Sequence, residues 1–238
     1  MNTAREIRNI WDEIGRLKRR VAGVASSEGG GGDAHAELMM AETFDGLTLG
    51  SIDGQGIYPR VGPFVSTISG TGTANVAVKA GADYMTRCAS GAPWAGNLAQ
   101  WELTFNADSY LSSGILKFKI RTSDVTGNGQ LRFYYNGDVY WIIIMGDSSF
   151  MRFKYTAAYA NVTAIVNNTW YDVELHWNSS SQTVTFFING AYVAYWQLGT
   201  TMRIPYLDKI EFWSASDSLN LDIDDLEIVN FGAHPSAI

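Results

Sequence analysis

The first thirty residues and the rest of the chain carry two different hydrophobic patterns. In the first segment the apolar residues recur in alternating steps of three and four, at Ile7, Ile10, Ile14, Leu17, Val21 and Val24. These are the a and d positions of a heptad repeat, which is typical of a coiled coil. After residue 40 the helical period disappears, and short β-type runs alternate with clusters of Gly, Asn, Asp and Ser.

The N-terminal segment is predicted to form a parallel homotrimer over residues 1–24. Isoleucine at both a and d favours three or four strands over two, and the register places Glu13 at g and Lys18 at the following e, where interchain ion pairs form. An alternative is an amphipathic helix that packs against its own β-domain, because about 20 residues are marginal for an isolated coiled coil.

A glycine-rich linker follows the helical segment. Residues 25–37, with the sequence ASSEGGGGDAHAE, contain four consecutive glycines, and such a segment favours no regular element. We therefore predict three parts: the coiled coil of residues 1–24, the linker of residues 25–37 and a single β-domain of residues 38–238.

The β-domain is predicted to be a two-sheet antiparallel sandwich, because many short strands separated by turn residues are typical of that architecture. Its candidate strands are residues 64–68, 74–80, 98–105, 115–122, 130–135, 139–145, 150–155, 161–166, 169–178, 183–188, 191–197, 204–214 and 219–231.

Two hairpins give this sandwich a register. Asn136-Gly137 and Asn189-Gly190 each lie between β-rich runs, and Asn-Gly supplies the positive φ angles of a type I′ turn. Counting outward from each turn predicts one apolar face and one face that mixes rings with polar groups. Such mixed faces suit sugar rings, so the glycan-binding candidates are Arg132, Tyr134, Trp141, Phe187, Tyr192 and Trp196. The alternative is that these rings lie under a loop or at a subunit contact.

Composition and charge narrow the possible functions. The chain has a net charge of −7, and residues 1–28 carry six Lys/Arg against four Asp/Glu, so the remainder carries −9. This balance argues against nucleic-acid binding by the β-domain. Cys88 is the single cysteine and forms no intrachain disulfide. The N-terminus lacks an apolar run long enough for a signal peptide or a membrane span, so we expect cytoplasmic synthesis without membrane insertion.

The segments 168–177 (NTWYDVELHW) and 182–193 (QTVTFFINGAYV) resemble the core of the concanavalin A-like and laminin G-like jelly rolls. Residues 42–46 resemble the opening strand of that family, and residues 207–213 and 221–228 resemble its closing strands. The resemblance implies a jelly-roll sandwich that binds glycans or proteins. Some members of the family degrade polysaccharides, and many tie their first and last strands with calcium.

The densest acidic cluster is predicted to be a structural calcium site. Asp222, Asp224 and Asp225 lie close together in the last strand and repel one another unless a cation screens them, and Glu42 or Asp45 from an adjacent first strand would complete an oxygen shell. The alternative is that these aspartates form the solvent side of an alternating strand. Asp225 breaks the alternation, as a bulge or a metal ligand would.

The sequence favours binding over catalysis. Asp222-x-Asp224-x-x-Glu227 is similar to the Glu-x-Asp-x-x-Glu signature of glycosidases with this fold, but its first residue is Asp and it lies on the closing strand. The three histidines are scattered, and no catalytic triad can be assembled from them.

A jelly roll behind a trimeric coiled coil resembles bacteriophage fibre, spike or capsid-decoration proteins. We therefore expect a non-enzymatic homotrimer in a virion, anchored to other virion proteins through its N-terminal helix. Its head would bind host-surface glycans or make assembly contacts. The alternatives are a polysaccharide-degrading enzyme on the same fold and a cellular carbohydrate-binding module.

Overall fold

The computed structural model describes most of the predicted β-domain. The described residues are 37–56, 58, 60–69, 73–80, 83–89, 98–106, 111–146, 149–154, 159–179, 181–197, 206–214 and 219–231. The predicted coiled coil, with its six a and d residues, and the linker up to residue 36 lie outside them.

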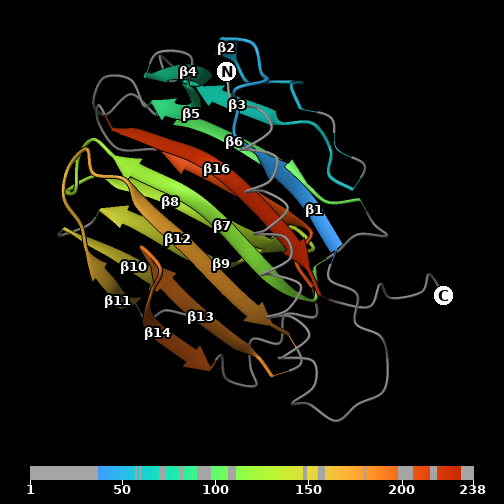
Figure 1. The fold of residues 1–238 in the computed structure, drawn as a ribbon, viewed down its shortest axis with the longest axis vertical. Coiled ribbons are helices and arrows are strands. Elements are labelled where there is room, and N and C mark those ends of the chain that lie inside the picture. Colours follow the sequence, from blue (N-terminus) through green and yellow to red (C-terminus); the bar gives the residue numbers. More distant parts are fainter. Residues whose placement is uncertain are drawn as a thin grey trace, which may run out of the picture.

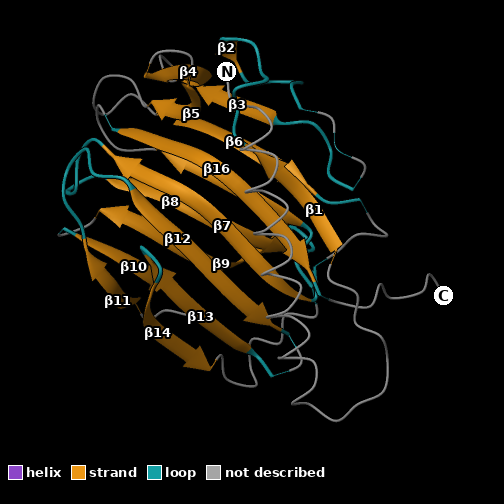
Figure 2. Ribbon diagram, in the orientation of Figure 1, coloured by secondary structure: helices purple, strands orange, loops and turns teal. Residues whose placement is uncertain are grey.

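The described residues form two antiparallel sheets and contain no helix (Figures 1 and 2). The nine-stranded sheet has the order β14 (Ala191–Gln197), β13 (Thr183–Ile188), β12 (Tyr171–Asn178), β7 (Ser113–Thr122), β16 (Asn220–Asn230), β5 (Asp83–Ala89), β4 (Thr73–Ala80) and β2 (Gly50–Ser51), with β1 (Glu37–Glu42) also paired to β16. The seven-stranded sheet has the order β11 (Tyr159–Ala164), β10 (Phe150–Lys154), β9 (Asp138–Gly146), β8 (Asn128–Tyr135), β15 (Lys209–Ser214), β6 (Leu98–Thr104) and β3 (Val65–Ser69). This arrangement is consistent with the predicted jelly-roll sandwich.

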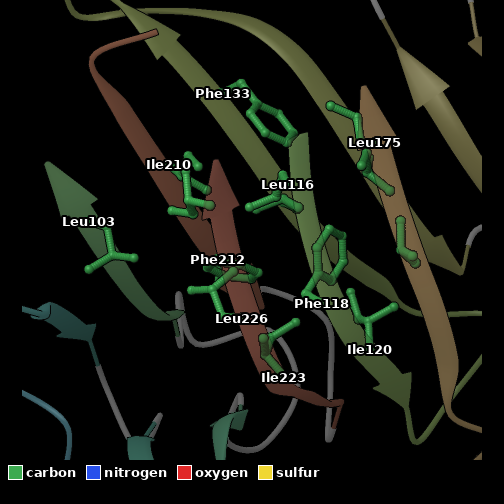
Figure 3. Packing of buried hydrophobic residues seen from close by; sticks show 14 of the residues in the cluster. Leu103, Leu116, Phe118, Ile120, Phe133, Leu175, Ile210, Phe212, Ile223 and Leu226 are labelled. Carbon is green, nitrogen blue, oxygen red and sulfur yellow. The ribbon is translucent and has the colours of Figure 1, made fainter. Parts of the chain in front are cut away.

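The core lies between the two sheets and comes from alternate residues of each strand. On β7, Leu116, Phe118 and Ile120 are buried, while Lys117 and Lys119 between them are not (Figure 3). Phe212 of β15 is fully buried; its ring stacks on Trp101 with the ring centroids 4.0 Å apart and meets Phe118 edge-on at 6.2 Å. Each large apolar side chain buried in this way contributes about 1.5–3 kcal/mol.

Both predicted hairpin turns are confirmed. Asn136 and Gly137 have φ angles of 51° and 85°, and Asn189 and Gly190 have φ angles of 51° and 77°, as a type I′ turn requires. The strands that they join, β8 with β9 and β13 with β14, pair directly across each turn.

Each hairpin also contains a bulge, which the sequence analysis does not predict. The register of β13 and β14 shifts between Phe186 and Phe187, so Trp196 lies opposite Val184 instead of on the outer face. Its indole packs 5.3 Å from the Phe186 ring and 5.1 Å from the Phe153 ring, in the core. The placement of Trp196 on the mixed outer face is therefore wrong.

A similar shift occurs in the other hairpin, between Phe133 and Tyr134. The bulge places the backbone of Trp141 opposite Phe133, whereas simple counting from the turn places it opposite Arg132. The Trp141 side chain lies outside the described part of the structure. Its candidacy as a glycan ligand therefore stays a prediction.

The first and last strands pair, as the family resemblance implies. In β1 and β16, Glu42 lies opposite Leu226. The register of β16 against β7 shifts between Asp224 and Glu227, and Asp225 has a φ angle of 48°. The interruption at Asp225 is therefore a bulge, one of the two explanations that its position in the sequence leaves open.

Three strands are absent from the predicted ones, namely β1, β2 and β5; residues 42–46, which resemble an opening strand, share only Glu42 with β1. The β5 sequence DYMTRCA follows a stretch rich in Gly and Ala, and its inward residues Thr86 and Cys88 are small. The described part of the chain contains no helix long and apolar enough to cross a membrane.

Candidate functional site

The outer face of the seven-stranded sheet carries a row of polar and aromatic side chains across three adjacent strands. Cross-strand pairing places Arg132 of β8 opposite Glu211 of β15, and Glu211 opposite Glu102 of β6. Two residues further along β15, on the same face, Trp213 lies opposite Gln130 of β8. We call this set the polar ladder; it comprises Glu102, Gln130, Arg132, Tyr134, Lys209, Glu211 and Trp213.

Glu211 is the centre of the polar ladder, and its side chain is only 3% exposed. Arg132 Nη1 donates to Glu211 Oε1 at 3.2 Å, and the Tyr134 hydroxyl donates to Glu211 Oε2 at 3.0 Å. Lys209 Nζ lies 3.7 Å from the same Oε2. A buried carboxylate is costly unless it is paired in this way, so these contacts fix Glu211 and its partners in place.

The rings of the polar ladder are paired with its cations. The Arg132 guanidinium lies 4.0 Å from the centroid of the Trp213 ring, and Lys209 Nζ lies 4.0 Å from the centroid of the Tyr134 ring. Arg132 Nε also donates to Gln130 Oε1 at 2.7 Å. Arg132, Lys209 and Tyr134 therefore each have their position set by at least two neighbours.

The electrostatics of the polar ladder follow from burial and close pairing. Burial lowers the pKa of Lys209, but its hydrogen bond to Glu102, at 2.8 Å, and the charge of Glu211 outweigh this and leave the pKa raised. Burial, with the nearby Glu211 charge, also raises the pKa of Tyr134. At neutral pH Lys209 is thus an ammonium and Tyr134 a hydroxyl donor.

Arg132 and Tyr134 are predicted from the sequence, whereas the partners that organise them are not. Glu211, Lys209 and Trp213 alternate with the buried Ile210 and Phe212 in β15. This period of two is readable in the sequence KIEFWS once the strand is known to be half buried. Glu102 holds the matching position in β6, and only the pairing of β6 with β15 brings it to Glu211.

The outer face of the nine-stranded sheet is held by ion pairs. Asp222 of β16, 2% exposed, lies between two guanidinium groups. Arg87 Nε contacts Asp222 Oδ1 at 2.6 Å, and Arg121 Nη2 contacts Asp222 Oδ2 at 2.6 Å. Arg121 also lies 4.6 Å from the centroid of the Trp170 ring.

The other acids of the predicted calcium site point to separate basic or backbone donors. Lys79 Nζ pairs with Asp224, and Lys119 Nζ lies 2.6 Å from Asp225 Oδ2. The Tyr58 hydroxyl donates to Glu42, and the amide of Tyr84 donates to Asp45 Oδ1 at 2.7 Å. Within the described ranges, no three His, Cys, Asp or Glu side chains form a group able to hold a metal ion. The five predicted ligands are therefore not gathered in one site.

Exposed rings form a second feature of the nine-stranded sheet, near its β14 edge. Tyr192 and Tyr195 are 63% and 50% exposed. The Phe187 ring lies 6.0 Å from the Tyr192 ring and 5.0 Å from the His176 ring. We call Phe187, Tyr192, Tyr195 and His176 the tyrosine patch. Of the candidates predicted for glycan binding, Phe187 and Tyr192 lie here, on the sheet opposite the polar ladder.

The sequence matches no protein-family model, and no curated protein matches it. Several solved structures are similar in fold. One is a sialidase, with a TM-score of 0.59 and 10% identity over 73% of this chain. This chain spans only 17% of the sialidase chain. At this identity the likeness shows a shared fold alone.

Two further structures align less closely. A carbohydrate esterase from the Shiga toxin-encoding bacteriophage phi24B has a TM-score of 0.49 and 13% identity over 70% of this chain and 90% of its own. Botulinum neurotoxin type C, whose cell entry depends on two ganglioside molecules, has a TM-score of 0.49 and 16% identity over 76% of this chain and 46% of its own.

Proposed function

We propose that the protein is a non-enzymatic, glycan-binding head and that the polar ladder is its binding face. The observation that carries this proposal is a preorganised set of part-exposed side chains on an outer sheet face, where Glu102, Arg132, Lys209 and Trp213 surround the buried Glu211 and Tyr134. Sugar hydroxyls are bound by such fixed carboxylate, ammonium and guanidinium groups, and immobilising them in the free protein lowers the entropy cost of binding.

Binding to an array of saccharides tests this proposal, with Trp213→Ala and Glu211→Gln as the site variants. Each is expected to weaken binding at least tenfold, because Trp213 supports Arg132 and Glu211 orients three donors. Tyr192→Ala, on the opposite sheet, is the matched control and should bind as the wild type does. Unchanged binding by both site variants, with loss in Tyr192→Ala, would move the site to the tyrosine patch.

We further propose that this head is carried by a homotrimer in a virion fibre, spike or capsid decoration. The support is the unbroken heptad pattern before the glycine-rich linker. Three heads on one stalk would turn weak single-site contacts into avidity. Native mass measurement should give a trimer for the full chain and a monomer after removal of residues 1–28, and a monomer in both cases contradicts the trimer.

One observation favours the alternative of a polysaccharide-degrading enzyme. Glu102 and Glu211 lie directly opposite each other on adjacent strands, and such enzymes use two carboxyl groups. Both groups contact Lys209 Nζ, however, and Glu211 is only 3% exposed, so this carboxylate is not open to a bound polysaccharide. Release of reducing ends from a bound polysaccharide, abolished by Glu102→Gln, would establish the enzyme and overturn the non-enzymatic proposal.

A further inference from the structure

The four charges of the polar ladder cancel in two pairs. Arg132 Nη1 lies 3.2 Å from Glu211 Oε1. Lys209 Nζ lies 2.8 Å from Glu102 Oε2. Each cation therefore already holds a carboxylate of the protein in a charge-assisted hydrogen bond. An acidic ligand on this face would have to compete with both carboxylates, so the polar ladder gives it no net attraction.

Glu102 is the carboxylate of the polar ladder that lies at the surface. Its side chain is 21% exposed, whereas that of Glu211 is 4% exposed. On the side away from Glu211, Glu102 lies opposite Val65 of the edge strand β3, and Val65 is 44% exposed. A ligand that lies across β3, β6 and β15 therefore contacts Glu102, while Glu211 is shielded from it.

The hydrogen bonding of Glu102 leaves it able to accept from a ligand. Within the described part of the chain its one hydrogen-bond partner is Lys209, which donates to Oε2. An ionised carboxylate accepts hydrogen bonds and donates none. The other oxygen, Oε1, can thus accept from a sugar hydroxyl. It repels a sugar carboxylate or sulfate, which is negatively charged and has no proton to donate.

The adjacent row of the same face carries no charge on β3, β6 and β15. Thr67 of β3 lies opposite Gln100 of β6, and Gln100 lies opposite Trp213 of β15. All three residues are exposed or part-exposed. They supply a hydroxyl, an amide and a ring, which suit the hydroxyls and the C–H faces of an uncharged sugar.

Two further cations of this sheet, Arg152 and Lys154 of β10, lie too far from Glu102 to reverse its effect. In the order of the sheet β10 is four strands from β6, about 19 Å at the usual strand spacing. Exposed charges separated by more than the Debye length, about 8 Å at physiological ionic strength, are largely screened from each other. The charge that a ligand meets at Glu102 is therefore set by Glu102 and Lys209.

We propose that the polar ladder selects uncharged saccharides and that Glu102 is the residue that excludes acidic ones. This inference rests on the proposed glycan-binding function and names the ligand class of the same site. Glu102 accepts from the hydroxyls of a neutral sugar and repels the carboxylate or sulfate of an acidic one. One side chain therefore provides both a contact to the favoured ligand and a repulsive element against the other.

The experiment uses the full chain and an array in which uronic-acid, sialic-acid and sulfated saccharides each stand beside the same saccharide without its acidic group. The wild-type protein should retain the neutral members at least about tenfold more tightly, and added salt should reduce that ratio. Glu102→Gln should lower the ratio at least about tenfold. The amide keeps an oxygen that accepts from hydroxyls and gains a donor for an acid, and Lys209 is left with Glu211 alone, whose Oε2 lies 3.7 Å from Nζ.

The matched control is Glu227→Gln, on the outer face of the nine-stranded sheet. Glu227 also pairs with a lysine, Lys117 at 3.4 Å, and its side chain is 28% exposed. The variant therefore makes the same change to the net charge at a similar ion pair. It should keep the ratio of the wild type, because β16 belongs to the other sheet. Thermal melting checks that both variants are folded.

Three results would overturn the inference. They are equal or tighter retention of acidic saccharides by the wild type, an unchanged ratio in Glu102→Gln, and an equal fall of the ratio in Glu227→Gln. Each of them leaves the proposed function standing, because the wild type still binds saccharides. Retention of no saccharide by the wild type overturns both.

Discussion

The two outer faces of the sandwich each bury a carboxylate at the centre of a sheet, but they pair it differently. Asp222, on the nine-stranded sheet, is held by two guanidinium groups and lies among further ion pairs. Glu211, on the seven-stranded sheet, is held by one guanidinium group, one hydroxyl and one more distant ammonium, next to the rings of Tyr134 and Trp213.

This difference supports a structural role for Asp222 and agrees with the recognition role that we propose for the face around Glu211. Arg87 and Arg121 supply donors that are matched to both oxygens of Asp222, so that carboxylate is fully used by the protein. Around Glu211 the donors are of several chemical kinds, and the buried ring of Tyr134 and the half-buried ring of Trp213 accompany them. A buried acid by itself therefore says little about function, and the chemistry of its partners says more.

The largest effect should come from removing the Asp222 charge. Asp222→Ala leaves two half-buried arginines facing each other without a counter-ion, so we expect a loss of about 3–5 kcal/mol in the free energy of unfolding. Urea denaturation measures it. Asp225→Asn removes the charge of a side chain that is 42% exposed and keeps a residue type that tolerates the φ angle of 48°, so it should cost less than about 1 kcal/mol. Equal losses in the two variants would contradict the structural role of Asp222.

The second-largest loss of stability should come from Trp196, which the β14 bulge places in the core while the neighbouring Tyr195 stays on the surface. Trp196→Ala should cost about 3 kcal/mol, because its indole packs on Phe153 and Phe186. Tyr195→Ala, one residue before it, should change stability by less than about 0.5 kcal/mol because its ring is half exposed. The reverse order in denaturation experiments would mean that the strand has no bulge.

Alkaline pH should weaken the polar ladder before it weakens the cluster of Asp222, Arg87 and Arg121, which we call the Asp222 cluster. The pKa of Lys209 is raised in the folded state, so its pairs with Glu102 and Glu211 stabilise the fold at pH values below the ordinary lysine pKa of about 10.4. This contribution is lost as the pH rises through the raised pKa. In the Asp222 cluster, by contrast, the hydrogen bond between Arg87 and Asp222 raises the pKa of Arg87. Arg87 therefore stays charged over the same pH range.

Thermal melting between about pH 9 and 11.5 tests that order, since lysine titrates in this range and arginine does not. Lys209→Arg should flatten the fall in Tm, because a guanidinium group keeps its charge there. Lys119→Arg is the comparison on the other sheet, where the hydrogen bond to Asp225 also raises the lysine pKa; because Asp225 is 42% exposed and solvent screens the pair, this variant should flatten the fall less. Identical profiles for the wild type and Lys209→Arg would mean that Lys209 does not contribute.

The smallest effect is expected from calcium. Each of the five predicted ligands already pairs with a lysine, an arginine, a hydroxyl or a backbone amide, so a chelator should leave the Tm unchanged. Melting curves with a chelator and with added calcium measure this. A fall in Tm on chelation would establish a calcium site after all.

Much of the fold is predictable from local signals, whereas the site depends on pairing between distant strands. The Asn-Gly turns are visible because two adjacent residues dictate their φ angles. Each of the thirteen predicted strands has an observed counterpart, since the alternation of apolar residues is itself local. The contact between Glu102 and Glu211 joins residues far apart in the chain, and no local pattern records it.

The bulge in β14 explains the misplacement of Trp196 in the same physical terms. A bulge adds one residue to one strand, and no sequence signal near Val193 distinguishes a bulged from a regular β14.

The acidic cluster of β16 likewise depends on distant strands. Its spacing is visible in the sequence, but Lys79, Arg87 and Lys119, which pair with the acids, come from other strands.

The bulge in β14 determines which side of the sheet each later residue of the strand faces. Every residue after it is turned to the opposite side of the sheet, so a single-residue deletion there would exchange Tyr195 and Trp196 between water and core without altering either residue. Related sequences should therefore be aligned across this strand by sheet face, since an ungapped alignment through such a deletion would compare a surface ring with a buried one.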